Sequence, residues 1–382
     1  MKNRNLSPEN PRQPHKIPDL DIIDLEQQSE APNPPADKDS AREDEPAKRG
    51  FLSHINIHIV LLVVAVLFVA GIAYKIMNFG VRVDLDEIFS DGPGEYNDSY
   101  DMILPRLDAS HNPIYKDYSQ GSTILAFGNA PFSDDRDSED NLVRLMEKET
   151  GATIYNCSIS GSFLATDWQQ PDQDNAPRDL FNAYWLCNIA AGNKDVQSFY
   201  LHAMEVLGDQ APPEAREVYD ILTSISLEEV DAIVIMYDAS DYLAGRDMYD
   251  PNNPTNISTF AGNTEAIIEY VNYHAPHVRI IVMSPPYAFG VDDNGEYVSS
   301  DIKKYGKQDA LSVYVALQYA SCVARSTTFV DNLYTTFNED TARKYLTDNV
   351  HLNQKGRERV AERFAYALNY YNNAGQNSES RD

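Results

Sequence analysis

The sequence predicts an α/β fold, a three-layer α/β/α sandwich around a parallel sheet, preceded by one transmembrane helix. Between residues 121 and 373, short apolar runs alternate with segments of helical periodicity, which is typical of a chain that winds strands and helices in turn. The runs are apolar at consecutive positions, as strands are when helices cover both faces of their sheet. With 42% hydrophobic residues in a chain of 382, this region has enough apolar side chains for a sizeable core.

The first part of the chain divides into a polar tail and an apolar segment. Residues 1–54 are rich in Pro, Asp, Glu, Gln and Ser, so they bury too little apolar surface to offset the entropy of folding, and we expect a disordered tail. Residues 55–77 (INIHIVLLVVAVLFVAGIAYKIM) are long enough as a helix to cross a hydrocarbon layer of roughly 30 Å. A cleaved signal peptide would begin with a short basic region, whereas about fifty mixed-charge residues precede this segment. We therefore predict a transmembrane helix.

The flanking charges predict the orientation of this helix. Basic residues cluster on its N-terminal side at Lys38, Arg42, Lys48 and Arg49. The C-terminal side mixes Lys75 and Arg82 with several acids. Since basic flanks stay in the cytoplasm, we expect a single-pass protein of the cell membrane with a cytoplasmic N-terminus and an extracytoplasmic C-terminal domain.

Beyond the apolar segment we expect an acidic stalk and lead-in at residues 78–120, a domain at 121–373 and a disordered tail at 374–382. Apolar runs predict strands at residues 122–127, 152–157, 232–237, 278–283 and 328–331. Helical patterns lie between them at 139–149, 180–191, 195–206, 213–223 and 264–274, and a last helix is expected at 353–371.

Charge and cysteine content exclude several functional classes. The chain has 31 basic and 59 acidic residues, of which 8 and 11 lie in residues 1–54, so the rest carries a formal charge of −25. Such a surface repels phosphate backbones, and we expect no nucleic-acid partner.

Cys157, Cys187 and Cys322 lack CxxC spacing, and Cys157 and Cys187 are expected to be buried thiols, although one disulfide pair remains an alternative. No Walker loop, dinucleotide fingerprint or GxSxG elbow is present, and no cofactor is expected.

Ligands of parallel α/β sheets bind beyond the carboxyl ends of the strands, so the loops there are the candidate site. Four of these loops have unusual sequences: 127–131 (FGNAP), 158–162 (SISGS), 238–242 (DASDY) and 348–353 (DNVHLN).

This set, in this order, resembles the SGNH (GDSL-type) hydrolases, a family of esterases and acyl-hydrolases with a flavodoxin-like sheet. The resemblance spans about residues 122–371, and its most specific element is Asp348-Asn-Val-His351-Leu-Asn353, which matches the family's Asp-x-x-His-Leu-Asn/Ser. The resemblance implies that His351 is the general base and that Asp348 orients it and stabilises its charged form.

Two of the four blocks depart from the family pattern. The Gly-Asp-Ser block falls on Gly128-Asn129-Ala130, so Ala130 stands where the nucleophilic serine is expected and has no hydroxyl. Asn129 is expected to line the oxyanion and binding site together with Gly161 and Ser240. The oxyanion glycine corresponds to Gly161, although Ser160 or Ser162 would present an N–H equally well. The oxyanion asparagine of the third block becomes Ser240, whose hydroxyl donates from a shorter arm.

Other residues have two interpretations each. Ser133 is either a displaced nucleophile or part of a helix N-terminus that it caps. The carboxylates of residues 134–140 lack EF-hand spacing, and we expect no metal site. Trp168 and the Tyr184-Trp185 pair either line a sugar-binding rim or pack in the interior.

Two functional hypotheses follow. The resemblance implies ester hydrolysis or acyl transfer on envelope or extracellular glycans, with an acylated carbohydrate or small ester as substrate and His351 activating water or an acceptor hydroxyl directly. Alternatively, the domain is a catalytically inactive relative that binds a glycan or a protein partner.

Overall fold

The computed structural model describes residues 101–107, 112–118 and 121–372. The predicted tails, the predicted transmembrane segment and most of the predicted stalk lie outside these residues. Within the described ranges, no helix combines the length and apolar character needed to cross a membrane.

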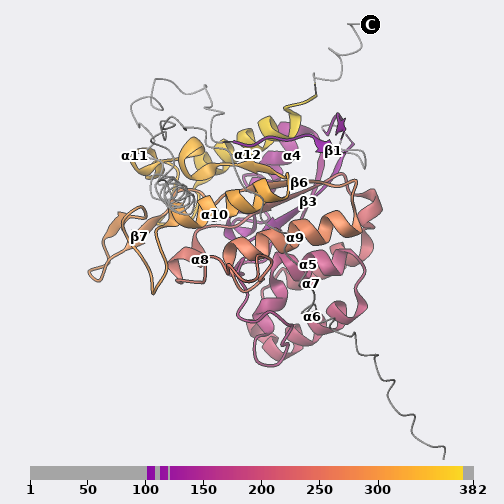
Figure 1. Ribbon diagram of the computed structural model, residues 1–382, viewed down its shortest axis with the longest axis horizontal. Coiled ribbons are helices and arrows are strands. Elements are labelled where there is room, and N and C mark those ends of the chain that lie inside the picture. The colour runs from indigo at the N-terminus through magenta and orange to yellow at the C-terminus, as the bar shows by residue number, and fades with distance from the viewer. Residues whose placement is uncertain (1–100, 108–111, 119–120, 373–382) are drawn as a thin grey trace, which may run out of the picture. The chain divides into compact units, whose positions relative to one another are not determined.

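A five-stranded parallel sheet forms the centre of the domain (Figure 1). Its strands are β3 (Thr123–Gly128), β4 (Thr153–Asn156), β5 (Ala232–Met236), β6 (Arg279–Met283) and β9 (Thr328–Val330). They are arranged in the order β4-β3-β5-β6-β9. All five predicted strands are confirmed, and the order is that of a flavodoxin-like sheet, in which the second strand lies outside the first.

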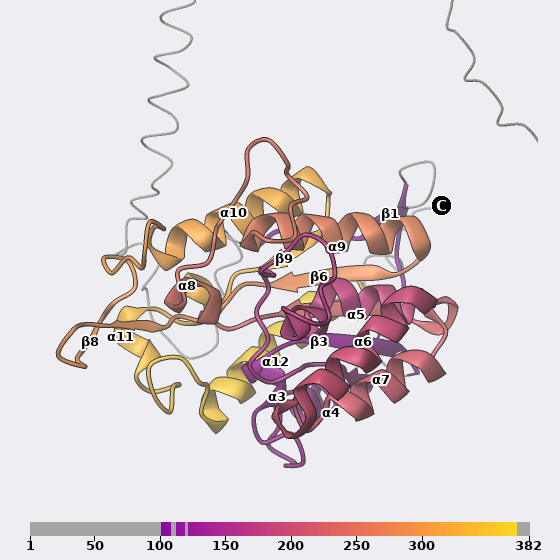
Figure 2. The same cartoon turned by 90° about the horizontal axis from the view of Figure 1, so that it is seen from below.

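Helices cover both faces of the sheet. α4 (Leu142–Thr150) packs against α12 (Gln354–Asn369), and α9 (Phe260–His274) packs against α10 (Leu311–Ala324). Figure 2 shows α9 and α10 on one side of the strands and α4 and α12 on the other. α5 (Ala183–Ala190) contacts α9 and also α6 (Lys194–Leu207) and α7 (Ala215–Ser224). The α/β sandwich predicted from the apolar runs is therefore confirmed.

The prediction missed one long helix and the short elements. α10 was missed because its sequence, LSVYVALQYASCVA, has apolar residues on most sides and so lacks a clear helical period. The short helices are α3 (Ala130–Ser133), α8 (Ser240–Leu243) and α11 (Glu339–Ala342), with 3₁₀ turns at Pro177–Phe181, Gly208–Gln210 and Leu227–Glu229 and a π turn at Asn332–Thr336. Two antiparallel ribbons complete the fold, β1 (Arg106–Leu107) with β2 (Pro113–Ile114) and β7 (Phe289–Val291) with β8 (Tyr297–Ser299).

The segment before the sheet is part of the domain. Met102 exchanges two backbone hydrogen bonds with Phe329 of β9, at 3.0 and 2.9 Å, so the chain runs antiparallel along the edge of the sheet. Asp101 forms a fully buried ion pair with Arg363 of α12. Breaking such a pair leaves a buried charge without its partner, which is strongly destabilising. The lead-in is thus fixed to the core.

The three cysteines are buried and unpaired, which confirms that Cys157 and Cys187 are interior thiols. Burial raises the pKa of each of the three thiols, because a thiolate loses its hydration there. They are therefore small apolar side chains of the core at neutral pH.

Candidate functional site

The candidate site lies where β3 and β5 end side by side. Gly128, the last residue of β3, pairs with Met236 of β5. A Cβ atom at position 128 would lie 1.9 Å from the Met236 carbonyl oxygen. Only glycine fits this close approach, after which the chain turns at Asn129 into α3. The turn places Ala130 at the carboxyl edge of the sheet.

Asn129 connects three of the four predicted loops. Its side-chain nitrogen donates to the Ser162 carbonyl at 3.0 Å and to the Asp238 carboxylate at 2.8 Å. Its side-chain oxygen accepts the backbone N–H of Asp238 at 2.9 Å. These bonds use both amide hydrogens, so the buried Asn129 side chain positions the loops and has no hydrogen left to donate to a bound oxyanion.

Asp348 and His351 form the predicted pair. The Nδ1 atom of His351 lies 2.7 Å from Asp348 Oδ2. The other carboxylate oxygen accepts the backbone N–H groups of Val350 and His351 at 2.9 and 2.8 Å, which fixes the carboxylate in its turn. Both side chains are about two-fifths exposed, at 42% and 43%. Since Nδ1 faces Asp348, Nε2 is the ring atom left for substrate or water.

Two further loops hold this turn in place. Asn353 caps α12 and accepts the N–H of Gly356 at 3.1 Å. A Cβ atom at position 356 would lie 2.4 Å from the Tyr345 carbonyl oxygen, so the helix start packs directly on the preceding backbone. On the other side, Asn349 exchanges two hydrogen bonds with the backbone of Phe289 in β7, at 2.8 and 3.1 Å. The His351 loop is therefore supported from both sides.

The charges around His351 favour its protonated form. Burial by itself would lower the pKa of His351, but the hydrogen bond to Asp348 and the negative charges of Asp134, Asp348 and Asp238 raise it above the ordinary value. For Asp348, burial opposes ionisation, and hydrogen bonds from His351 and Val350 outweigh it, so the pKa is lowered. Asp348 therefore stays ionised and stabilises the imidazolium that forms when neutral His351 takes up a proton as a general base.

Asp134 is a neighbour of this site that the sequence reasoning did not assign to it. Its backbone N–H donates to the Ala130 carbonyl at 2.9 Å, one helical turn after Ala130. Burial raises the pKa of the Asp134 carboxyl; the charge of His351 acts against this shift and that of Asp238 acts with it. The end of α3, the loop after β5 and the His351 loop thus share one electrostatic field. A signal for Asp134 was available in its spacing of four residues from Ala130, which returns to the same helix face.

Three groups are candidates for stabilising an oxyanion. The backbone N–H of Ala130 opens α3 and has no acceptor among the described residues. Gly161 is exposed with a φ of 67°, a left-handed conformation that favours glycine, and nothing lies within 4 Å of where its Cβ would be. Ser240 opens α8, and its N–H is held by Asp238 at 2.9 Å, whereas its hydroxyl has no partner in the described part of the chain. Ala130 therefore lacks a hydroxyl but still presents a donor.

Ser133 fits neither of its two interpretations. It is the last residue of α3, and the next long helix, α4, is capped by Asn141 instead. The expected capping role is therefore wrong. The hydroxyl oxygen of Ser133 is buried and has no partner in the residues that the structure describes, so it does not face solvent as a nucleophile must.

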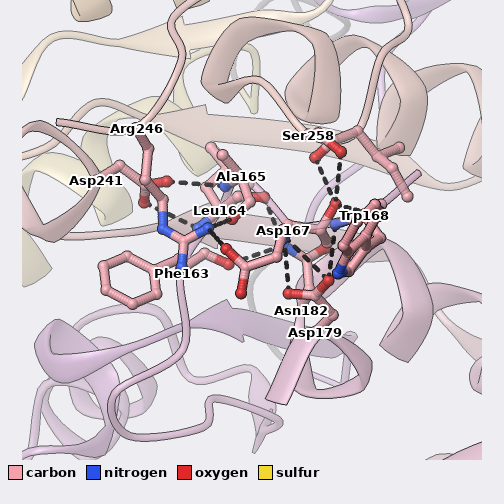
Figure 3. A network of polar contacts seen from close by, with 12 residues as sticks. Phe163, Leu164, Ala165, Asp167, Trp168, Asp179, Asn182, Asp241, Arg246 and Ser258 are labelled. Atoms are coloured by element: carbon pink, nitrogen blue, oxygen red, sulfur yellow. Dashed lines mark hydrogen bonds and ion pairs between the residues drawn. The ribbon is translucent and has the colours of Figure 1, made fainter. Parts of the chain in front are cut away.

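The loop after β4 is tied to the same edge of the sheet (Figure 3). Asp241, next to Ser240, is fully buried and accepts the backbone N–H groups of Leu164 and Ala165 at 2.9 and 2.8 Å. Burial raises its pKa to about 6, although these two hydrogen bonds act in the opposite direction. These two hydrogen bonds partly offset the free-energy cost of burying the Asp241 carboxyl, and they fix the loop at Leu164 and Ala165.

No family model and no curated protein matches the sequence. Similar solved structures include Est24, a carbohydrate acetylesterase from Sinorhizobium meliloti (13% identity, 65% of this chain and 99% of that chain, TM-score 0.39). Others are an aryl esterase from M. smegmatis (13%, 66% and 100%, 0.39) and a protein from Parabacteroides merdae described as a GDSL-like lipase (16%, 67% and 99%, 0.38).

By these descriptions the three neighbours are a carbohydrate acetylesterase, an aryl esterase and a GDSL-like lipase. With TM-scores below 0.5, they carry no argument about activity.

Proposed function

We propose that the domain hydrolyses esters, with water as the nucleophile and His351 as the general base. The observation that carries the proposal is the 2.7 Å contact between His351 Nδ1 and Asp348. An imidazole held this way by an ionised carboxylate has its tautomer fixed and Nε2 free to accept a proton. Ester hydrolysis needs such a base, whereas a site that only binds a ligand does not.

The reaction would proceed in two steps. Water attacks the ester carbonyl carbon while His351 Nε2 takes one of its protons, and a C–O bond forms as the carbonyl becomes an oxyanion. The Ala130 N–H, the Gly161 N–H and the Ser240 hydroxyl are the proposed donors to that oxyanion. When the intermediate collapses, the bond to the alkoxide breaks, and the leaving oxygen takes the proton back from His351. The products are a carboxylic acid and an alcohol, so atoms and charge balance.

A second candidate function rests on Ala130. Without a hydroxyl at this position no acyl-enzyme ester forms there, and removing the serine from such a triad reduces turnover by a factor of about 10⁶. The domain would then be an inactive relative that binds a glycan or a protein partner.

Hydrolysis by the full-length protein distinguishes the two functions. Release of p-nitrophenol from p-nitrophenyl acetate, or of acetate from an acetylated glycan, is expected in the unaltered protein and is expected to disappear in His351→Ala. Equal rates in both proteins would count against hydrolysis at this site and favour the binding function.

The cellular setting is a separate proposal. We propose that residues 55–77 anchor the protein in the cell membrane, with the domain outside the cytoplasm and acylated envelope or extracellular glycans as substrate. The apolar length of the segment and its basic N-terminal flank support this. Protease added to intact cells should then digest the domain and leave residues 1–50 protected. Cleavage within residues 1–50 would show the opposite orientation, with the tail outside the cell.

A further inference from the structure

The loop after β4 carries an exposed aromatic side chain, Trp168. Trp168 is 59% exposed, whereas Trp185 is 7% exposed. The ring centres of Trp185 and Tyr184 lie 4.9 Å apart. Interior packing therefore applies to the Tyr184-Trp185 pair, whereas Trp168 faces solvent and remains a candidate for a sugar-binding rim. Single exposed apolar residues are common, so exposure alone assigns no role to Trp168.

The backbone of Trp168 is unusually well fixed for an exposed position. Its N–H and that of Asp167 both donate to the carboxylate of Asp179 at 2.9 Å. Its carbonyl accepts the hydroxyl of Thr166 at 2.8 Å. Asp179 is buried, and burial raises its pKa although the two N–H groups oppose this. A buried carboxyl therefore fixes the backbone that carries this exposed indole, so less backbone freedom is lost when a ligand stacks on the ring.

A fixed polar pair lies beside the indole. Asp167 and Arg246 form an ion pair at 2.8 Å, and the guanidinium also donates to the Ala165 carbonyl at 3.0 Å. The same guanidinium lies over the ring of Phe163, with its central carbon 3.9 Å from the ring centre. Figure 3 shows Asp167 between Arg246 and Trp168. The carboxylate is 59% exposed and can accept hydrogen bonds from hydroxyl groups of a ligand.

This surface and the proposed hydrolytic site share their supports. Asp241 holds Leu164 and Ala165 and is adjacent in sequence to Ser240. Ser162, six residues before Trp168, accepts a hydrogen bond from Asn129. The loop that carries Trp168 is therefore tied to the carboxyl edge of the sheet at Ser162, Leu164 and Ala165.

We infer that Trp168 and the Asp167–Arg246 pair form a subsite for a sugar ring of a neutral glycan. An indole face stacks on the apolar C–H face of a pyranose, and the fixed carboxylate accepts from its hydroxyls. The formal charge of −25 after residue 54 disfavours polyanionic glycans. This inference rests on the proposed function for its substrate, and it names the part of that substrate which is not the ester.

Binding can be tested without turnover. The probes are β-1,4-linked hexamers of glucose, xylose, mannose and N-acetylglucosamine, which contain no ester. The chain has two tryptophans, and the other one is buried, so a change in tryptophan emission during titration reports on Trp168. At least one hexamer is expected to change this emission and to give a measurable Kd by calorimetry with the full-length protein.

The variants identify the surface. Trp168→Ala is expected to raise that Kd about tenfold or more, and Trp168→Phe to restore part of the affinity. Asp167→Ala is expected to weaken binding as well. The matched control is Tyr273→Ala, because Tyr273 is another exposed aromatic residue, 82% exposed on α9. The Kd of this variant for the hexamer should equal that of the unaltered protein. Circular dichroism checks that each variant is folded.

The outcomes separate this inference from the proposed function. His351→Ala is expected to keep the Kd for the hexamer while losing hydrolysis. Binding without any hydrolysis in the unaltered protein would overturn the proposed reaction and leave the subsite in place. No binding of any hexamer at millimolar concentration, or an unchanged Kd in Trp168→Ala, would overturn the subsite.

Discussion

Restoring a hydroxyl at position 130 is the sharpest test of the site. Ala130→Ser adds one oxygen at the start of α3, to a residue that is 9% exposed. If the Asp348–His351 pair and the oxyanion donors face this position, the new hydroxyl becomes a nucleophile that His351 deprotonates.

The expected gain follows from what a complete triad supplies. Its members together contribute about 10⁶ in turnover. Ser240 stands where the SGNH hydrolases have an asparagine with a longer side chain. Loss of one such oxyanion donor lowers turnover by a factor of about 10²–10³. We therefore expect the hydrolysis rate of p-nitrophenyl acetate to rise at least about 10²-fold, which corresponds to roughly 2.7 kcal/mol of transition-state stabilisation.

The assay compares four full-length proteins: the unaltered chain, Ala130→Ser, His351→Ala and the double variant. The gain is expected to vanish when His351→Ala is added to Ala130→Ser. A burst of p-nitrophenol equal to the enzyme concentration would show the acyl-enzyme. A folded Ala130→Ser protein with no gain would refute the reasoning, because it would mean that Ala130, His351 and the donors do not meet in a working arrangement.

Three further predictions concern pH and stability. Activity should fall as pH drops through a pKa above the ordinary histidine value, because His351 is a base only when neutral; Asp348→Asn should move this midpoint to lower pH, and an unmoved midpoint would remove Asp348 from the role. Gly128→Ala should lower the free energy of unfolding by about 3 kcal/mol in urea titrations, since its Cβ would meet a strand carbonyl at 1.9 Å; unchanged stability would contradict the close approach. Asp101→Ala should lower it by about 3–5 kcal/mol by leaving Arg363 buried without its ion-pair partner, and a loss below about 1 kcal/mol would show that the lead-in is not part of the core.

The sequence alone determined the features that depend on neighbouring residues. The five strands were evident from apolar runs such as Ile233–Ile235, which the structure buries at every position. The Asp348–His351 contact was expected from the resemblance to the SGNH hydrolases, and it is also a local contact. A spacing of three residues lets one turn bring the carboxylate to the ring, and the turn is closed by local backbone N–H groups. The helix α10 was not evident at all, because a helix that is apolar on most sides has no periodic signal.

The tertiary structure decided which distant residues meet. Asn129 uses its amide on partners 33 and 109 residues away, so its positioning role depends on the register of β3 beside β5. Asp134 enters the field of His351 only because α3 and the last loop converge at one sheet edge. The two interpretations of Trp168 and Trp185 were left open by the sequence, and the packing places Trp168 in solvent and Trp185 inside. Short spacings fix local contacts through backbone geometry, whereas these long-range contacts require the whole sheet to be assembled first.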